Sequence, residues 1–191
     1  SEKAVPQCWA ANRTIPFGFP AIVRGSRSAG GRQEDLLHER TKADRSGSQP
    51  GRLSTAVIPV SRIHFDKSFR SLCESNACGN FGMCWMCPPD VGDIVKLIEE
   101  AKTFQSALAY QTVGELADGY DIEGMLEAGN RHNRLAQKIS GAFASPPFGK
   151  TLHLGAGGCR VCPVCAKRTG EPCRFPDRAM AFPGAYGVAV S

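Results

Sequence analysis

The chain has 191 residues and a formal net charge of +5, with 42% hydrophobic and 21% charged residues. This length suits one modest domain, or one domain with a tail, and excludes a multidomain assembly. No stretch approaches the roughly 18 consecutive apolar residues of a membrane span, and prolines interrupt the N-terminal apolar residues before a secretory core forms. We therefore expect a cytoplasmic protein without membrane contact.

Residues 1–52 have the composition of a disordered basic tail. Gly, Ser, Pro and Arg fill 22 of these positions, and no hydrophobic period persists. The segment has nine Lys/Arg and five Asp/Glu, a net charge of +4, whereas residues 53–191 have fourteen and thirteen, a net charge of +1. Because it lacks a compact basic run with interleaved aromatic residues, nucleic acid is not an expected partner.

Residues 53–191 are predicted to form a cysteine-rich metal-binding α/β domain. A β-branched run with alternating apolar residues predicts a strand over 56–65, in which Pro59 indicates a sheet edge or a bulge. Asp90 or Asp93 is a suitable N-cap for a helix whose apolar residues recur at helical spacing as far as Ala101.

The chain continues with a buried strand predicted over 106–113, a longer helix over 122–143 that ends at Ser145-Pro146-Pro147, and a strand over 151–154. This alternation predicts a small α/β sandwich of two or three layers with about three strands and two main helices. If the strands run parallel, the loops that follow them open at one edge of the sheet.

Eight of the nine cysteines lie in two stretches of fifteen residues, which we call the first cysteine loop (residues 73–87) and the second cysteine loop (residues 159–173). Seventy-one residues without cysteine separate them. In a reducing compartment such clusters indicate metal binding rather than disulfides. The candidate metal ligands are Cys73, Cys78, Cys84, Cys87, Cys159, Cys162, Cys165 and Cys173.

The second cysteine loop carries the most specific signal, because Cys159, Cys162 and Cys165 are separated by two residues each. This spacing lets three thiolates converge on a four-iron, four-sulfur cubane, as in the bacterial ferredoxin run. In that run three residues separate the third cysteine from a fourth, which ligates the other cluster, whereas seven residues separate Cys165 from Cys173 here.

Glycines precede this loop at Gly155, Gly157 and Gly158, and they are candidate cofactor-binding residues. Without side chains they let backbone N–H groups approach cluster sulfurs closely. No Lys-Ser/Thr pair follows, so a phosphate loop is not indicated.

The first cysteine loop has gaps of four, five and two residues, and its four thiols could form a site alone. Cys87-Pro88 also resembles the outlying cysteine and proline of the ferredoxin run, so Cys87 could instead join the cysteines of the second loop. Both groupings give eight ligands and two sites, and we favour the local one because closing long loops costs entropy.

The motifs of both loops also carry a family resemblance. They are Phe65-Asp66, Arg70, Cys73-x4-Cys78-Gly79, Phe81-Gly82, Cys87-Pro88-Pro89, Gly155-Ala156-Gly157-Gly158-Cys159-x2-Cys162-x2-Cys165, Pro172-Cys173-Arg174-Phe175-Pro176 and Ala185-Tyr186-Gly187-Val188. With these, residues 56–191 resemble the predicted metal-binding, cysteine-rich family called domain of unknown function 2284. The resemblance implies seven shared cysteines, with Cys84 as an addition, and supports metal binding.

We interpret the chain as an iron–sulfur protein with one or two 4Fe-4S clusters that exchanges electrons with a partner redox protein. One alternative is a structural or regulatory zinc module, because tetrahedral zinc also accepts four thiolates. Another is an iron–sulfur enzyme whose cluster keeps an open coordination site. No hydrolytic or acyl-transfer motif is present, so no catalytic residue is predicted.

Overall fold

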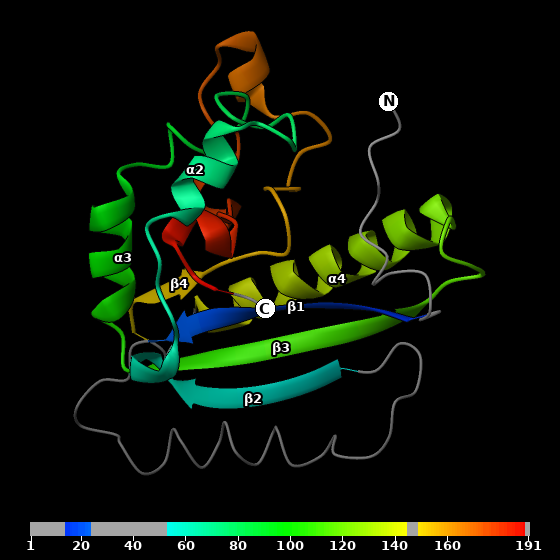
Figure 1. Cartoon of the computed structure of the whole chain (residues 1–191), viewed down its shortest axis with the longest axis horizontal. Helices are drawn as coiled ribbons and strands as arrows, with labels where there is room; N and C mark the ends of the chain where they lie inside the picture. Colours follow the sequence, from blue (N-terminus) through cyan, green and yellow to red (C-terminus); the bar gives the residue numbers. More distant parts are fainter. Residues whose placement is uncertain (1–13, 24–52, 145–148, 190–191) are drawn as a thin grey trace.

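The computed structural model describes residues 14–23, 53–144 and 149–189. Its sheet has the order β2-β3-β1-β4, and every pair of neighbours is antiparallel (Figure 1). The strands are β1 (Thr14–Val23), β2 (Leu53–Pro59), β3 (Ser106–Glu115) and β4 (Thr151–His153). The helices are α2 (Phe69–Glu74), α3 (Ile94–Lys102) and α4 (Ile122–Phe143). Short 3-10 turns are η2 (Val60–Arg62), η3 (Ala166–Thr169), η4 (Pro176–Arg178) and η5 (Pro183–Tyr186).

The predicted small α/β class is confirmed, and the elements expected after residue 53 are present. The first of them ends earlier than expected, since β2 stops at Pro59 on the sheet edge and a 3-10 turn follows. Asp93, not Asp90, caps α3, and its carboxylate accepts hydrogen bonds from two backbone N–H groups of the first turn. Ser145-Pro146-Pro147, the residues predicted to end the long helix, lie outside the described residues. No helix in the described ranges is both long and apolar enough to cross a membrane.

β1 is a strand within the segment predicted to be a disordered tail, so that prediction does not hold for these ten residues. β1 pairs with β3 along its whole length and with β4 over three residues. Pro16 and Pro20 argue against a strand on sequence alone. Among the described strands, however, only β4 pairs with the second side of β1, and it covers three residues, so most of that side is a sheet edge, where a missing N–H is tolerated. Residues 1–13 and 24–52 of the predicted tail lie outside the described residues.

Because the strands are antiparallel, the cysteine loops do not open at a common edge of a parallel sheet. Instead, the C-terminal segment (residues 179–189) connects them. Phe65, before the first loop, forms a β-bridge with Val188, and Leu154, before the second, forms one with Ala181. As a result the first and second cysteine loops lie side by side. Figure 1 shows the orange second loop away from the sheet.

The C-terminal segment is also part of the main hydrophobic core. Leu154, Ala181 and Val188 are buried in one cluster with residues of α3 and the start of β3. Gly187 closes η5 with φ +67°, and its backbone carbonyl accepts a hydrogen bond of 2.7 Å from the N–H of Asp66. Burial of this apolar surface therefore fixes both chain segments that lead into the cysteine loops.

α4 packs on the sheet over β3 and β1, and its inner side contains a buried histidine. The ring of His132 stacks on Tyr110 at 5.3 Å, and its Nδ1 lies 2.9 Å from Thr112 Oγ1. On the same face, the Tyr110 hydroxyl is 2.7 Å from Nε2 of His153. These histidines thus belong to the core between α4 and the sheet.

Replacement of Gly187 by alanine should destabilise the fold more than the same change at Gly170. Both glycines have positive φ, which costs alanine about 1 kcal/mol. Only at Gly187 would the new Cβ lie 2.9 Å from a backbone oxygen, that of Asp66, and from Ile98 Cδ1. We expect Gly187→Ala to lower the free energy of unfolding in urea by about 3 kcal/mol and Gly170→Ala by about 1 kcal/mol. Equal losses would contradict this account.

Stability should fall as the pH drops from about 6.5 to about 4. Burial, with a contribution from the charge of His132, lowers the pKa of His153 to about 4. The unfolded chain then takes up a proton in this window that the folded protein does not, so the free energy of unfolding decreases by up to about 3 kcal/mol. His153→Gln, measured by urea unfolding at several pH values, should show a much weaker dependence. An unchanged pH profile would contradict the assignment to His153.

Candidate metal centre

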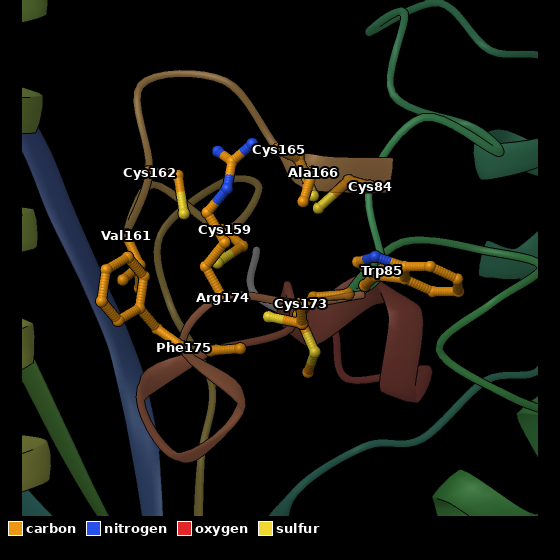
Figure 2. Close-up of a pocket in the computed structure, with 12 residues that line it drawn as sticks. Cys84, Trp85, Cys159, Val161, Cys162, Cys165, Ala166, Cys173, Arg174 and Phe175 are labelled. Atoms are coloured by element: carbon orange, nitrogen blue, oxygen red, sulfur yellow. The ribbon is translucent and has the colours of Figure 1, made fainter. Parts of the chain in front are cut away.

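Five cysteines line one cavity between the two loops (Figure 2). Four come from the second cysteine loop, and the fifth, Cys84, comes from the first. The four from the second loop are Cys159, Cys162, Cys165 and Cys173, which we call the second site. Among the described residues no histidine, aspartate or glutamate lines this cavity, and the metal-binding donors that do line it are thiols.

Cys84 connects the two loops through its sulfur and is only 4% exposed. The thiol of Cys87 donates a hydrogen bond to this sulfur, and so do the Cys165 thiol and the backbone N–H groups of Met86 and Cys159. The Cys87 bond is the main reason why the pKa of Cys84 lies below its usual value. The Cys87 thiol keeps its proton in this hydrogen bond to Cys84, and this, together with burial, raises the pKa of Cys87.

The other three cysteines of the first loop, Cys73, Cys78 and Cys87, line a separate cleft, and we call them the first site. Cys73 lies on α2, and a tight turn carries the chain on to Cys78. Asn76 makes this turn with φ 52°, a conformation that asparagine adopts more readily than most residues. Its side-chain oxygen accepts a hydrogen bond of 3.0 Å from the N–H of Phe81.

The cavity and the cleft divide the cysteines by loop with one exception, and this lining does not test which cysteines share a metal. Cys87, the candidate for crossing to the second loop, remains with Cys73 and Cys78. Cys84 crosses instead. The Cys87-Pro88 pattern had indicated Cys87 as the cysteine that could join the second loop, whereas the contact between the loops brings Cys84 there.

Of the three candidate glycines, two lie beside the cysteines. Gly157, with φ +79°, and Gly158 line the cleft of the first site, and Gly158 also borders the cysteines of the second loop. Gly155 has a structural role: its N–H donates to the carbonyl of Ala181 and its Cα faces Met180.

Polar contacts hold the two loops together. The indole N–H of Trp85 donates to the carbonyl oxygen of Glu171 at 2.9 Å. Lys167 forms an ion pair with Asp90, and its ammonium lies 4.1 Å from the centre of the Trp85 ring. Both members of this ion pair are largely buried, so the contact is less screened than a surface pair.

Positive charge surrounds the second site. The guanidinium of Arg174 pairs with Glu171 and lies close enough to Cys162 and Cys165 to interact with their charge. Arg160 and Arg168 line an open cavity that also contains Cys159 and Cys162. Within the described residues, neither of these two arginines has an ion-pair partner.

The thiols of each site line a hollow. In the described ranges, no three His, Cys, Asp or Glu side chains converge closely enough to hold a single metal ion. As all-thiol donor sets, the two sites fit soft metals, namely zinc or the iron of an iron–sulfur cluster.

Comparison with protein-family models finds one that matches residues 56–191, and its description is predicted metal-binding protein (DUF2284). Comparisons with curated proteins and with solved structures give no significant match.

Removal of the Lys167 ammonium should destabilise the contact between the loops. The Asp90 carboxylate would lose its ion pair while still buried, and its Oδ2 already lacks a hydrogen-bond partner in the described structure. We expect Lys167→Ala to lower the free energy of unfolding by about 2–3 kcal/mol. The matched control is Lys150→Ala, which removes an exposed pair with Glu100 and should cost less than about 1 kcal/mol. Urea unfolding measures both variants, and similar losses would refute the prediction.

Proposed function

The chain belongs to the DUF2284 family of predicted metal-binding proteins, and on this premise we propose that it holds two 4Fe-4S clusters and exchanges electrons with a partner redox protein. The observation that carries this proposal is the cavity lined by five cysteines. Three of them have the two-residue spacing typical of cubane ligands.

The donor set supports iron–sulfur over zinc. A tetrahedral zinc ion uses four ligands and commonly takes two Cys-x-x-Cys pairs. The second loop instead offers the run Cys159, Cys162 and Cys165, with Cys173 on the same cavity. In this proposal these four bind one cluster, and Cys73, Cys78 and Cys87 bind the other. A bound cluster would supply one-electron transfer.

Residues of the chain offer positive charge to balance a cluster and a contact that joins the two sites. A four-iron cluster with four thiolates is anionic, and Arg174 offers a compensating positive charge beside Cys162 and Cys165. Cys84 touches a cysteine of each proposed site, Cys87 and Cys165, so the two sites share one hydrogen-bonded contact. This contact provides a short path between them.

The surface beside the second site suits an acidic partner. Arg160 and Arg168 border its cysteines, and exposed apolar side chains lie nearby at Met83 and Val164. Positive charge next to a redox centre attracts an acidic partner protein and speeds their encounter.

Metal analysis of protein prepared without oxygen tests the clusters. We expect about eight iron and eight acid-labile sulfide per chain, the content of two cubanes. Cys162→Ala and Cys78→Ala, which each remove a ligand of a different site, should each lose about half of both elements. Cys84→Ser should retain both elements, because the proposal assigns the Cys84 thiol to neither cluster as a ligand.

Two results would contradict parts of this proposal. A colourless protein that contains zinc without sulfide would refute the clusters. Loss of half of the iron in Cys84→Ser would instead make Cys84 a ligand and refute the seven-cysteine assignment.

A further inference from the structure

Cys84 and Cys87 face each other across a single tight turn of the first cysteine loop. The backbone N–H of Cys87 donates a hydrogen bond of 2.9 Å to the carbonyl oxygen of Cys84. A turn closed in this way holds its first and fourth Cα atoms within about 7 Å, and disulfides span Cα separations of about 4.4–6.8 Å. The thiol of Cys87 also donates a hydrogen bond to the Cys84 sulfur, so the two side chains point toward each other. The pair therefore has the placement that a disulfide needs.

Further contacts hold this turn in place. The backbone N–H of Gly82, before the turn, donates to the carbonyl oxygen of Pro88, after it, at 2.8 Å. Within the turn, the indole of Trp85 is bound to the carbonyl oxygen of Glu171 in the second loop. Because the turn is already fixed, closing a covalent bond across it costs little further conformational entropy.

The same spacing occurs twice in the second cysteine loop, but without such a turn. Cys159 and Cys162 are separated by two residues, and so are Cys162 and Cys165. In the described part of the chain, which includes this whole loop, neither pair has a backbone hydrogen bond between its two cysteines. The segment from Cys84 to Cys87 is thus the pair at this spacing that the backbone prepares for a disulfide.

We propose that Cys84 and Cys87 are a site of reversible oxidation, at which a hydroperoxide converts the two thiols of the metal-free chain into a disulfide. One sulfur attacks an oxygen of hydrogen peroxide, the O–O bond breaks, and a sulfenic acid and one water form. The other sulfur attacks the sulfenic acid, the S–S bond forms, and a second water leaves. The two sulfurs lose two electrons, the peroxide gains them, and both thiol protons end in the water molecules. A dithiol reverses the change by exchange.

The burial of the pair selects a small oxidant. Cys84 is 4% exposed and Cys87 is 9% exposed. Cys84 lines the open cavity that Arg160 and Arg168 border, and this cavity gives a molecule as small as hydrogen peroxide a route to the pair. Glutathione disulfide, a pair of tripeptides, is too large to bring its sulfurs to a side chain with this exposure. We therefore expect peroxide to oxidise the pair and glutathione disulfide to leave it reduced.

The oxidation has a consequence that rests on the proposed function, in which Cys87 is a ligand of the first site. Metals are bound by thiolate sulfur, and a disulfide has none to offer. Oxidation would leave Cys73 and Cys78 as the thiols of the described residues on the cleft of the first site, whereas the second site would keep its four. Oxidation of the pair would thus block metal loading of one site and leave the other available.

Mass spectrometry of the full-length chain tests the disulfide. Metal-free protein is kept without oxygen, treated with an equimolar amount of hydrogen peroxide, and then alkylated to mark every remaining thiol. We expect Cys84 and Cys87 to escape alkylation together, about ten-fold more often than any other pair, because a closed turn holds them. Dithiothreitol should restore both thiols, and glutathione disulfide at the same concentration should leave both open to alkylation.

Variants and unfolding locate the reaction. Cys84→Ser and Cys87→Ser should each remove the disulfide. Cys78→Ser is the matched control in the same loop, because it removes an exposed thiol outside the turn, and it should keep the disulfide. In protein unfolded in urea, where the turn is lost, the Cys84–Cys87 pair should form no more often than the Cys159–Cys162 pair. The same preference in urea would show that the fold does not create it.

Cadmium binding tests the consequence for the first site. Cd²⁺ is a soft metal that binds thiolates, and its thiolate absorption in the ultraviolet reports uptake without added reductant. Prior treatment with peroxide should lower cadmium uptake of the wild-type chain by about half, since one of two thiolate sites is lost. The uptake of Cys84→Ser should be the same with and without peroxide, because this variant cannot form the disulfide.

The outcomes separate this inference from the proposed function. Absence of the Cys84–Cys87 disulfide after peroxide, or equal yields of other pairs, would overturn the oxidation site and leave the clusters intact. A disulfide with undiminished cadmium uptake would uphold the oxidation site and overturn the assignment of Cys87 to the first site. Absence of iron and sulfide from protein prepared without oxygen would refute the proposed function, whereas the disulfide would still stand on mass spectrometry.

Discussion

Two β-bridges of the C-terminal segment fix the geometry on which both candidate sites depend. Phe65 and Leu154, the residues that lead into the cysteine loops, each pair with this segment. The strands before the loops give no such alignment, since the sheet is antiparallel. Bringing together loops that are 71 residues apart costs conformational entropy, and the buried cluster around Leu154, Ala181 and Val188 offsets it.

The two groups of cysteines differ in their surroundings, and this suggests different roles. The second site has arginines around it and a local set of four thiols. The first site has three thiols and an apolar cleft that no charged residue of the described ranges lines. Cys84 lies between them, in contact with both.

Elements defined by local interactions could be predicted from the sequence. α3 was predictable because its apolar spacing and its N-cap at Asp93 are encoded within a dozen residues. β1 was not, because its partners lie in β3 and β4, far along the chain, while its own prolines argue against a strand. The cysteines were identifiable as candidate ligands by their spacing. Which of Cys84 and Cys87 lies beside the second loop depends on how the loops face each other, and no local pattern encodes that.

The order of these parts along the chain affects biosynthesis. The C-terminal segment leaves the ribosome after both cysteine loops, because it follows residue 173. Until it has docked, the two loops lack their shared attachment. The arrangement of the cysteines described above therefore forms only after the chain has been synthesised as far as Val188.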